Sequence, residues 1–104
     1  MTEFIERIQK FQEKVLGPFT EDRTASLIDH IRKECDEVLN NPDCIEEWAD
    51  IILLGFAGAT RTGALPELIW DTILYKMDVN EYDRKWPDWR TVEEGKALEH
   101  IKEV

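Results

Sequence analysis

Residues 48–57 read Trp-Ala-Asp-Ile-Ile-Leu-Leu-Gly-Phe-Ala, and this stretch decides the fold. Its apolar side chains fall on nearly every side of a helix. The sequence therefore predicts a helix from about Pro42 to Thr60 that is buried all round. A chain of 104 residues has few other elements to surround such a helix. We expect a partner subunit to cover part of it, because a large exposed apolar face is an aggregation hazard.

The rest of the chain is also helical in pattern. Apolar residues recur at helical spacing over residues 4–16, 24–39 and 66–85. Asn41 is the expected N-cap of the helix that starts near Pro42, and the spacing of Thr91 and Glu94 is a capping box for a short last helix over residues 92–102. No segment alternates with period two, so we expect no strand. The sequence predicts a single all-α domain over residues 1–104, a four- to five-helix bundle completed by oligomerisation.

Composition places the chain in the globular class and narrows its partners. Hydrophobic residues make up 42% and charged residues 35%, and the formal net charge is −10. A field of this sign repels phosphate backbones, so we expect no nucleic-acid polymer as a partner. Anionic small molecules can still bind if divalent cations bridge them to the protein. No apolar run is long enough to span a bilayer and the N-terminus is too charged for a secretory signal, so we expect a cytoplasmic protein with Cys35 and Cys44 as free thiols.

Two pairs of carboxylates occupy unusual positions. Glu34 and Glu37 are three residues apart in one predicted helix, and Glu47 and Asp50 are three apart in the next, so each pair shares a helix face. Glu34 lies on the apolar stripe of its helix, and Asp50 lies inside the apolar run. A buried carboxylate without a partner is costly, which predicts that something compensates these charges.

The tight turn between the two helices predicts that they pack antiparallel, which would bring the four acids together. Like charges in one place require shared protons or cations, and Mg²⁺ prefers oxygen ligands. A Mg²⁺ site formed by Glu34, Glu37, Glu47 and Asp50 is therefore the favoured interpretation. A solvated acidic face remains the alternative for the first three. Di-iron and zinc sites are disfavoured, because no His follows a Glu at Glu-x-x-His spacing and the two cysteines are isolated.

Cations and an amide occur on the fourth predicted helix. Lys76 and Asn80 continue the row of Ile69 and Ile73, so they point to the same side as core residues. Lys76 could extend along apolar surface to reach solvent, or it could contact a phosphate together with Asn80. Arg84 and Lys85 lie about one turn further on and could contact a second phosphate or form a solvated helix end.

Several strings of the sequence resemble a known family. The spacing Glu34-x-x-Glu37, Glu47-x-x-Asp50 and Lys76-x-x-x-Asn80 resembles that of the all-α NTP pyrophosphohydrolases of the MazG type. Longer strings resemble the dATP/dGTP diphosphohydrolase branch, which includes phage MazZ proteins. These strings are Leu27-Ile28-Asp29-His30-Ile31-Arg32-Lys33-Glu34, Asn41-Pro42-Asp43, Glu46-Glu47-Trp48-Ala49-Asp50, Trp86-Pro87-Asp88-Trp89-Arg90 and Glu99-His100-Ile101.

The resemblance implies a helical bundle that forms dimers or tetramers and hydrolyses a nucleoside triphosphate to the monophosphate and pyrophosphate. It implies that the four acids bind Mg²⁺ or Mn²⁺ and that Lys76 and Asn80 contact phosphates. The family often has an Arg three residues after the Asn, where this chain has Asp83 followed by Arg84 and Lys85, as if one residue were added before Trp86.

Our mechanistic hypothesis is that two or more Mg²⁺ ions bridge the triphosphate and a water that attacks the α-phosphorus. Glu37, with Glu34 beside it, is the candidate for accepting the proton of that water. If the chain is encoded by a phage, it would act in the host cytoplasm. Two alternatives remain open at this point: a non-catalytic sensor module that binds metal and nucleotide, and a relative specific for dUTP or dCTP.

Overall fold

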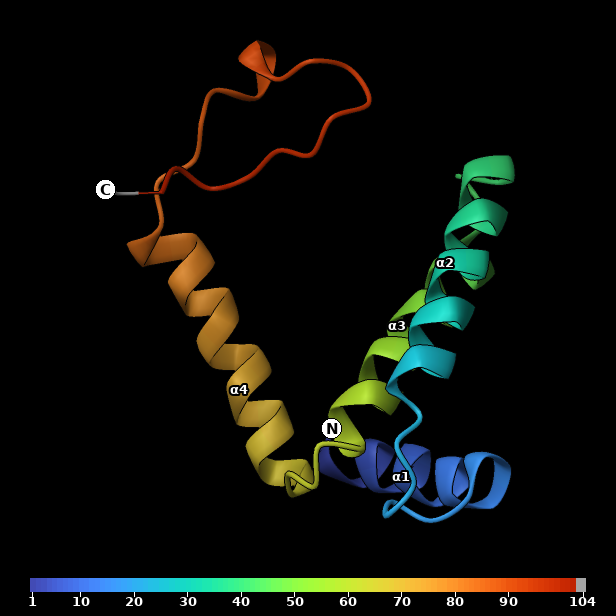
Figure 1. Ribbon diagram of the computed structural model, residues 1–104. Coiled ribbons are helices and arrows are strands. Elements are labelled where there is room, and N and C mark those ends of the chain that lie inside the picture. The colour runs from blue at the N-terminus through green and yellow to red at the C-terminus, as the bar shows by residue number, and fades with distance from the viewer. Residues whose placement is uncertain (103–104) are drawn as a thin grey trace. The chain divides into compact units, whose positions relative to one another are not determined.

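The computed structural model describes residues 1–102, and the prediction of an all-α fold is confirmed. The four α-helices are α1 (Thr2–Leu16), α2 (Thr24–Asn40), α3 (Ile45–Thr60) and α4 (Pro66–Asp78) (Figure 1). A π-helical turn, η1 (Val79–Asp83), continues α4, and a short 3-10 helix, η2 (Trp89–Thr91), follows. Among the described residues the only β-type pairing is an isolated bridge between Lys85 and Ile101. No helix in this part of the chain is long and apolar enough to cross a membrane.

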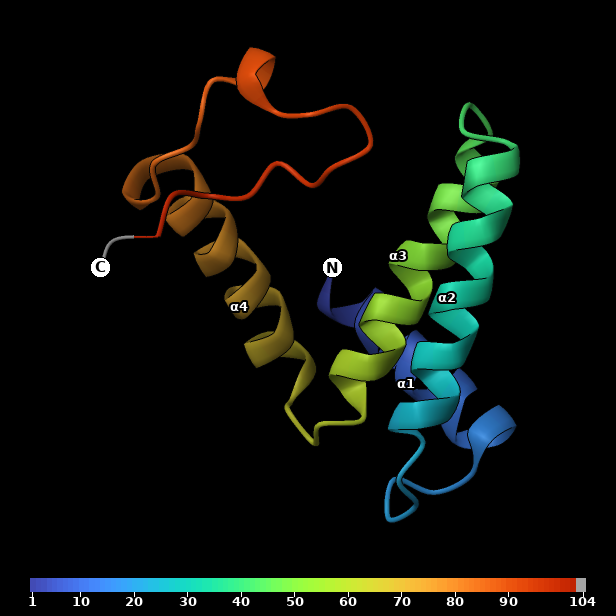
Figure 2. The same ribbon diagram turned by 45° about the horizontal axis from the view of Figure 1, so that its top comes forward.

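The chain divides into two compact units, Met1–Trp70 and Asp71–Val104. In the first unit α3 packs against both α1 and α2, and α2 and α3 run side by side in opposite directions (Figure 2). The buried apolar residues of this unit come from all of its helices: Ile5, Ile8, Leu27, Val38, Ala57 and Ile69. The predicted antiparallel packing of the second and third helices is thereby confirmed.

Two arginine side chains hold the connection between α1 and α2. Nε of Arg23, just before α2, donates to the carbonyl oxygen of Leu16 at 3.1 Å, and Arg61 makes further contacts. α1 ends at Leu16, where Gly17 adopts a positive φ of 86° that favours glycine. The guanidinium of Arg61, just after α3, donates hydrogen bonds to the backbone carbonyl oxygens of Gly17 (3.4 Å), Pro18 (3.1 Å) and Glu21 (2.9 Å). It also lies over the ring of Phe19, at 5.3 Å from the centroid. The end of α3 therefore positions the chain where it leaves α1.

The predicted start of the third helix was wrong by three residues. The helix begins at Ile45 rather than Pro42, and Cys44 rather than Asn41 is its N-cap residue. The carbonyl oxygen of Asn41 accepts a hydrogen bond from the N–H of Cys44 at 3.1 Å, which closes a turn before the helix starts. The indole Nε1 of Trp48 then donates to the carbonyl oxygen of Pro42 at 2.9 Å, which fixes this turn against the first helical turn.

The expectation that the third helix is buried all round is not met within this chain. Ile45, Trp48 and Ile52 of α3 are 81%, 49% and 59% exposed. α1 and α2 cover only part of the helix surface, and these three side chains lie outside that cover.

The predicted helix over residues 92–102 was also wrong. The described part of this segment is irregular, and Gly95 has a positive φ of 78°. Thr91 does not act as the N-cap, because its hydroxyl donates a hydrogen bond to the carbonyl oxygen of Asp88 at 2.7 Å inside η2. Asp88 instead caps η2 by accepting from the backbone N–H of Arg90 at 3.0 Å.

Candidate metal centre

Three of the four predicted acids come together at the α2–α3 pair. Glu34 of α2 and Glu47 and Asp50 of α3 each offer a carboxylate oxygen, and these oxygens all lie within 4.8 Å of one another. Residues 34 and 47 are on either side of the tight turn, and antiparallel packing brings their faces opposite each other. We call these three residues the acidic cluster. Glu34 and Glu47 are half-buried and Asp50 is exposed.

The exposure of Asp50 corrects one step of the sequence argument. Its position inside an apolar run suggested burial, but the neighbouring apolar side chains of α3 are themselves partly exposed in the chain. Asp50 belongs to the cluster because of its helical position three residues after Glu47, and not because the chain buries it.

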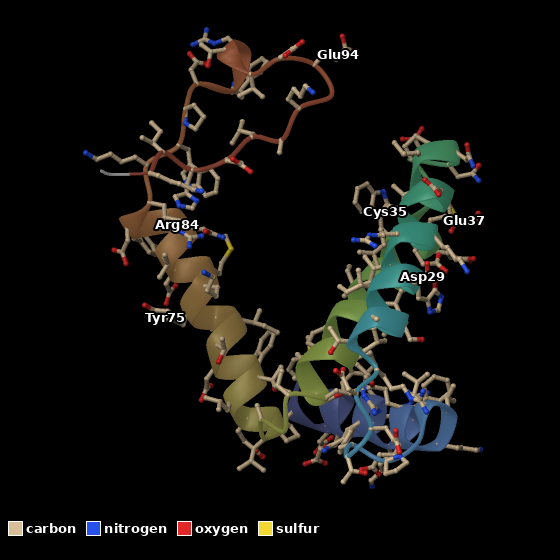
Figure 3. All side chains as sticks on the ribbon, viewed as in Figure 1. Asp29, Cys35, Glu37, Tyr75, Arg84 and Glu94 are labelled. Atoms are coloured by element: carbon tan, nitrogen blue, oxygen red, sulfur yellow. The ribbon has the colours of Figure 1, made fainter. Side chains whose placement is uncertain are left out.

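Glu37 lies outside the cluster but acts on it electrostatically. Its side chain is exposed on α2 (Figure 3). The pKa of the Glu47 carboxyl is raised above its usual value, first by desolvation and then by the negative charges of Glu37, Asp50, Glu34 and Glu46. The four predicted acids therefore share one region of negative potential, with three in mutual contact range and Glu37 at its edge.

Protein cations do little to neutralise this region. Within residues 1–102, the only ion pair to a cluster residue joins His30 Nε2 to Glu34 Oε1 at 3.2 Å, and His30 carries a charge only when protonated. Lys33 on the same helix pairs with Asp29 instead, at 3.2 Å. Closely spaced carboxylate oxygens without Lys or Arg partners are the ligand set of a hard divalent cation such as Mg²⁺, and the residues present therefore fit such an ion.

The predicted phosphate contacts lie in the second unit. Lys76 is exposed near the end of α4, and Asn80 is half-buried in η1 one turn later. The side-chain Oδ1 of Asn80 accepts a hydrogen bond from Nη1 of Arg84 at 2.6 Å (Figure 3 labels Arg84). The structure thus joins Asn80 to Arg84, which follows one turn after it.

The backbone forms a π-helical turn where Arg84 follows Asn80. The backbone N–H of Arg84 donates to the carbonyl oxygen of Val79 at 2.9 Å, a hydrogen bond that spans five residues instead of four. A π turn holds one more residue than an α turn. α4 accordingly ends at Asp78, and the predicted continuous helix to Lys85 was wrong in this last part.

A concave surface of about 420 Å³ follows this turn, lined by Arg84, Lys85, His100 and Lys102 together with Asp83 and Ile101. The rings of Trp86 and His100 meet edge to face at 5.9 Å, and Nε1 of Trp86 donates to the carbonyl oxygen of Asn80 at 2.6 Å. The C-terminal segment therefore folds back onto η1 and gathers basic side chains there.

The sequence interpretation missed one buried polar pair. Gln12 of α1 and Thr60 of α3 are 3% and 1% exposed, and the amide Nε2 of Gln12 donates to the Thr60 hydroxyl. Gln12 continues the buried row of Ile5 and Ile8 at helical spacing, and a glutamine on an apolar stripe was the signal that could have found it.

Comparison with known proteins gives one match. A family model described as dATP/dGTP pyrophosphohydrolase matches residues 4–104 of this chain. No curated protein and no solved structure matches it. The match covers both units, and so includes the acidic cluster as well as the Lys76–Asn80 segment.

Proposed function

The chain belongs to the dATP/dGTP pyrophosphohydrolase family and is a nucleoside triphosphate pyrophosphohydrolase, and from this premise we propose that it converts dATP or dGTP to the monophosphate and pyrophosphate in a reaction that requires Mg²⁺ or Mn²⁺. The observation that carries the metal requirement is the acidic cluster, in which carboxylate oxygens within 4.8 Å of one another have no Lys or Arg partner among residues 1–102. Family membership removes the reason to prefer a non-catalytic sensor or a pyrimidine-specific enzyme.

The four acids have two kinds of role in this proposal. Glu34, Glu47 and Asp50 hold the divalent ions, two or more per site, and Glu37 completes the ligand set or receives a proton. A divalent ion bound there lowers the pKa of a coordinated water and stabilises negative charge on phosphoryl oxygens. Glu37 is exposed at the edge of the cluster, so it is the carboxylate free to accept the proton of the attacking water.

The reaction makes one bond and breaks one bond. The water oxygen bonds to the α-phosphorus, the bond from the α-phosphorus to the bridging oxygen breaks, and pyrophosphate leaves. Lys76 and Asn80 bind the β- and γ-phosphates as donors, and Arg84 and Lys85 add positive charge beside them. Because Arg84 already donates to Asn80, it holds the amide of Asn80 in one orientation.

We further propose that the active form is a homodimer or homotetramer. The apolar side chains of α3 that α1 and α2 leave exposed, among them Trp48 and Ile52, need cover that a second copy supplies. Sedimentation or light scattering gives the subunit number, and a monomer at micromolar concentration would contradict this part of the proposal.

The decisive experiment supplies Mg²⁺ and each of the eight common ribo- and deoxyribonucleoside triphosphates, and measures pyrophosphate and orthophosphate separately. We expect pyrophosphate from dATP or dGTP and little orthophosphate. Asp50→Ala should abolish this release in a folded protein. Asp36→Ala, on α2 but outside the cluster, is the matched control and should keep activity. Near-normal turnover by Asp50→Ala would remove the site assignment.

A further inference from the structure

A groove of about 520 Å³ lies between α2 and α3 within the first unit. Its apolar lining comes from both helices and includes Leu27, Ile28, Ile31, Leu54, Gly55 and Gly58. Ile28 is 40% exposed, and Ile31 and Leu54 are half-buried, so a ligand in the groove can touch them. The volume lies within the roughly 300–1,000 Å³ of pockets that bind small molecules. The groove is therefore open to a flat ring system and large enough to hold it.

Two glycines keep the α3 side of this groove open. A Cβ placed on Gly55 or Gly58 meets no atom within 4 Å. Neither glycine has a positive φ, and glycine is less favourable than alanine inside a helix. The fold of the chain therefore does not require glycine at these two positions. What the glycines provide is space, because a flat molecule can approach the helix backbone closely where side chains are absent.

The end of the groove beyond these glycines has an aromatic wall that is already fixed. The ring of Phe19 lies under the guanidinium of Arg61 at 5.3 Å, and three hydrogen bonds to backbone carbonyl oxygens hold that guanidinium. Oδ1 of Asp22 accepts from the backbone N–H of Thr24 at 2.9 Å, which orders the loop before α2. Polar side chains of this loop also line the groove. A wall that is held in place before binding reduces the entropy cost of binding a ligand.

The other end of the groove leads to the acidic cluster. On α2, Ile31 lines the groove three residues before Glu34, and on α3 Leu54 lines it four residues after Asp50. Residues at these spacings are neighbours on a helix surface, so the groove and the cluster adjoin on both helices. Gly58 is about 12 Å from Asp50 along the helix axis. A nucleoside triphosphate has the matching layout, with its phosphates at one end and its base at the other.

We propose that this groove binds the base of the substrate, with the ring against the backbone at Gly55 and Gly58 and its polar edge toward the loop that carries Phe19. The triphosphate then extends toward the acidic cluster. Gly58 is on this view a position that determines specificity, because its missing side chain makes room for the two rings of a purine. The inference rests on the proposed function, which supplies the purine nucleotide.

The test compares two ligands that share a triphosphate and differ in the nucleoside. They are the α,β-methylene analogue of dATP, in which the bond to the leaving group resists hydrolysis, and inorganic triphosphate, each with Mg²⁺. We expect the analogue to bind about ten-fold more tightly, as expected for one base stacked on a protein surface. Only the analogue should shift the methyl NMR signals of Ile28 and Ile31 strongly. Shifts at Ile8 instead would place the base in the smaller cleft of about 200 Å³ beside α1 and overturn the inference.

Gly58→Leu fills the groove without touching the acidic cluster. Because a Cβ at this position has open space and leucine favours a helix more than glycine does, the variant should keep its fold. Its Kd for the analogue should rise about ten-fold, to that of inorganic triphosphate, whose own Kd should not change. Ala25→Leu, an exposed small-to-large change on α2 outside the groove, should keep the wild-type preference. A Gly58→Leu variant with an altered subunit number and an unchanged preference would show that a second copy occupies the groove, and the inference would be wrong.

Activity assays then separate this inference from the proposed function. If wild-type protein releases pyrophosphate from dATP but the analogue leaves the signals of Ile28 and Ile31 in place, the base site is wrong and the function stands. If these signals shift and Gly58→Leu removes the preference, but no triphosphate is hydrolysed, the base site stands and the function is wrong. Wild-type protein that binds the analogue no more tightly than inorganic triphosphate overturns the base site even if the Leu variant fails to fold.

Discussion

Both units of this chain have a net negative formal charge, but they place their charged groups in different structural settings. In the first unit, three carboxylates meet because two regular helices pack antiparallel on either side of a short turn, and no Lys or Arg among the described residues pairs with them. In the second unit, the cationic side chains follow an irregular π turn, and Arg84 is already bonded to Asn80. Under the proposed function the acids therefore still need a cation, whereas the amide of Asn80 is already bonded to Arg84. Changes to the two units should consequently have different effects.

The largest expected effect comes from removing one negative charge of the acidic cluster. Glu47→Gln should lower the rate of pyrophosphate release by more than about 100-fold, because residues that only support a metal ligand already contribute roughly 10–100-fold. The metal-free variant should melt at the same or a higher temperature than wild type, since repulsion is relieved. Glu46→Gln is the control on the same helix. Equal losses of activity in both variants would show that general charge, and not ligation, is responsible.

Removal of the metal should have an effect on activity of comparable size. A chelator should abolish activity, and Mg²⁺ should restore it. Mg²⁺ at about 100 times its Kd should stabilise the fold by about 2.7 kcal/mol, which calorimetry measures as a rise in Tm. The Glu47→Gln variant should show a smaller rise. A Tm that does not respond to Mg²⁺ or Mn²⁺ would contradict a metal centre in the first unit.

A smaller effect should follow from changes in the second unit. Lys76→Met should raise the KM for the triphosphate about ten-fold or more, as expected for a lost hydrogen bond to a charged group, with a lesser change in kcat. Lys96→Met, in the irregular C-terminal segment, is the control. If kcat falls while KM is unchanged, Lys76 contacts the reacting phosphorus region rather than the distal phosphates.

The smallest effect should be the pH dependence of the metal-free fold. Because the pKa of Glu47 is raised in the folded state, the folded protein binds a proton more readily than the unfolded chain. Stability should therefore rise as the pH falls through the raised pKa toward the ordinary value of 4.5. Asp22 and Asp88 have lowered pKa values, so their contribution is lost only below about 3.8. Urea unfolding at several pH values measures the curve, and Glu47→Gln should flatten its upper part.

Sequence periodicity predicted the helices correctly wherever residues close together in the sequence determine the structure. α1, α2 and most of α3 follow from their apolar spacing and from Gly17. The meeting of Glu34, Glu47 and Asp50 follows from two helices joined by a short turn. The wrong boundaries lie where contacts distant in the sequence intervene. The C-terminal segment is irregular because it pairs Ile101 with Lys85 and packs His100 on Trp86, and no local pattern announces those partners.

The site could be predicted only in part for the same reason. Glu34 and Glu37 are three residues apart, as are Glu47 and Asp50, yet Glu37 lies at the edge of the cluster. The rotation of α2 relative to α3 decides which carboxylates converge. Gln12 was missed because its partner, Thr60, is far along the chain.

The length of α3 has one further consequence. Asp50 lies near one end of this helix, whereas Thr60 and Arg61 at the other end fasten α1 and its exit loop. The helix therefore fixes a separation of about 15 Å along its axis between Asp50 and Thr60. One inserted residue between them would rotate the two ends by about 100° relative to each other, so α3 should tolerate substitutions far better than changes of length.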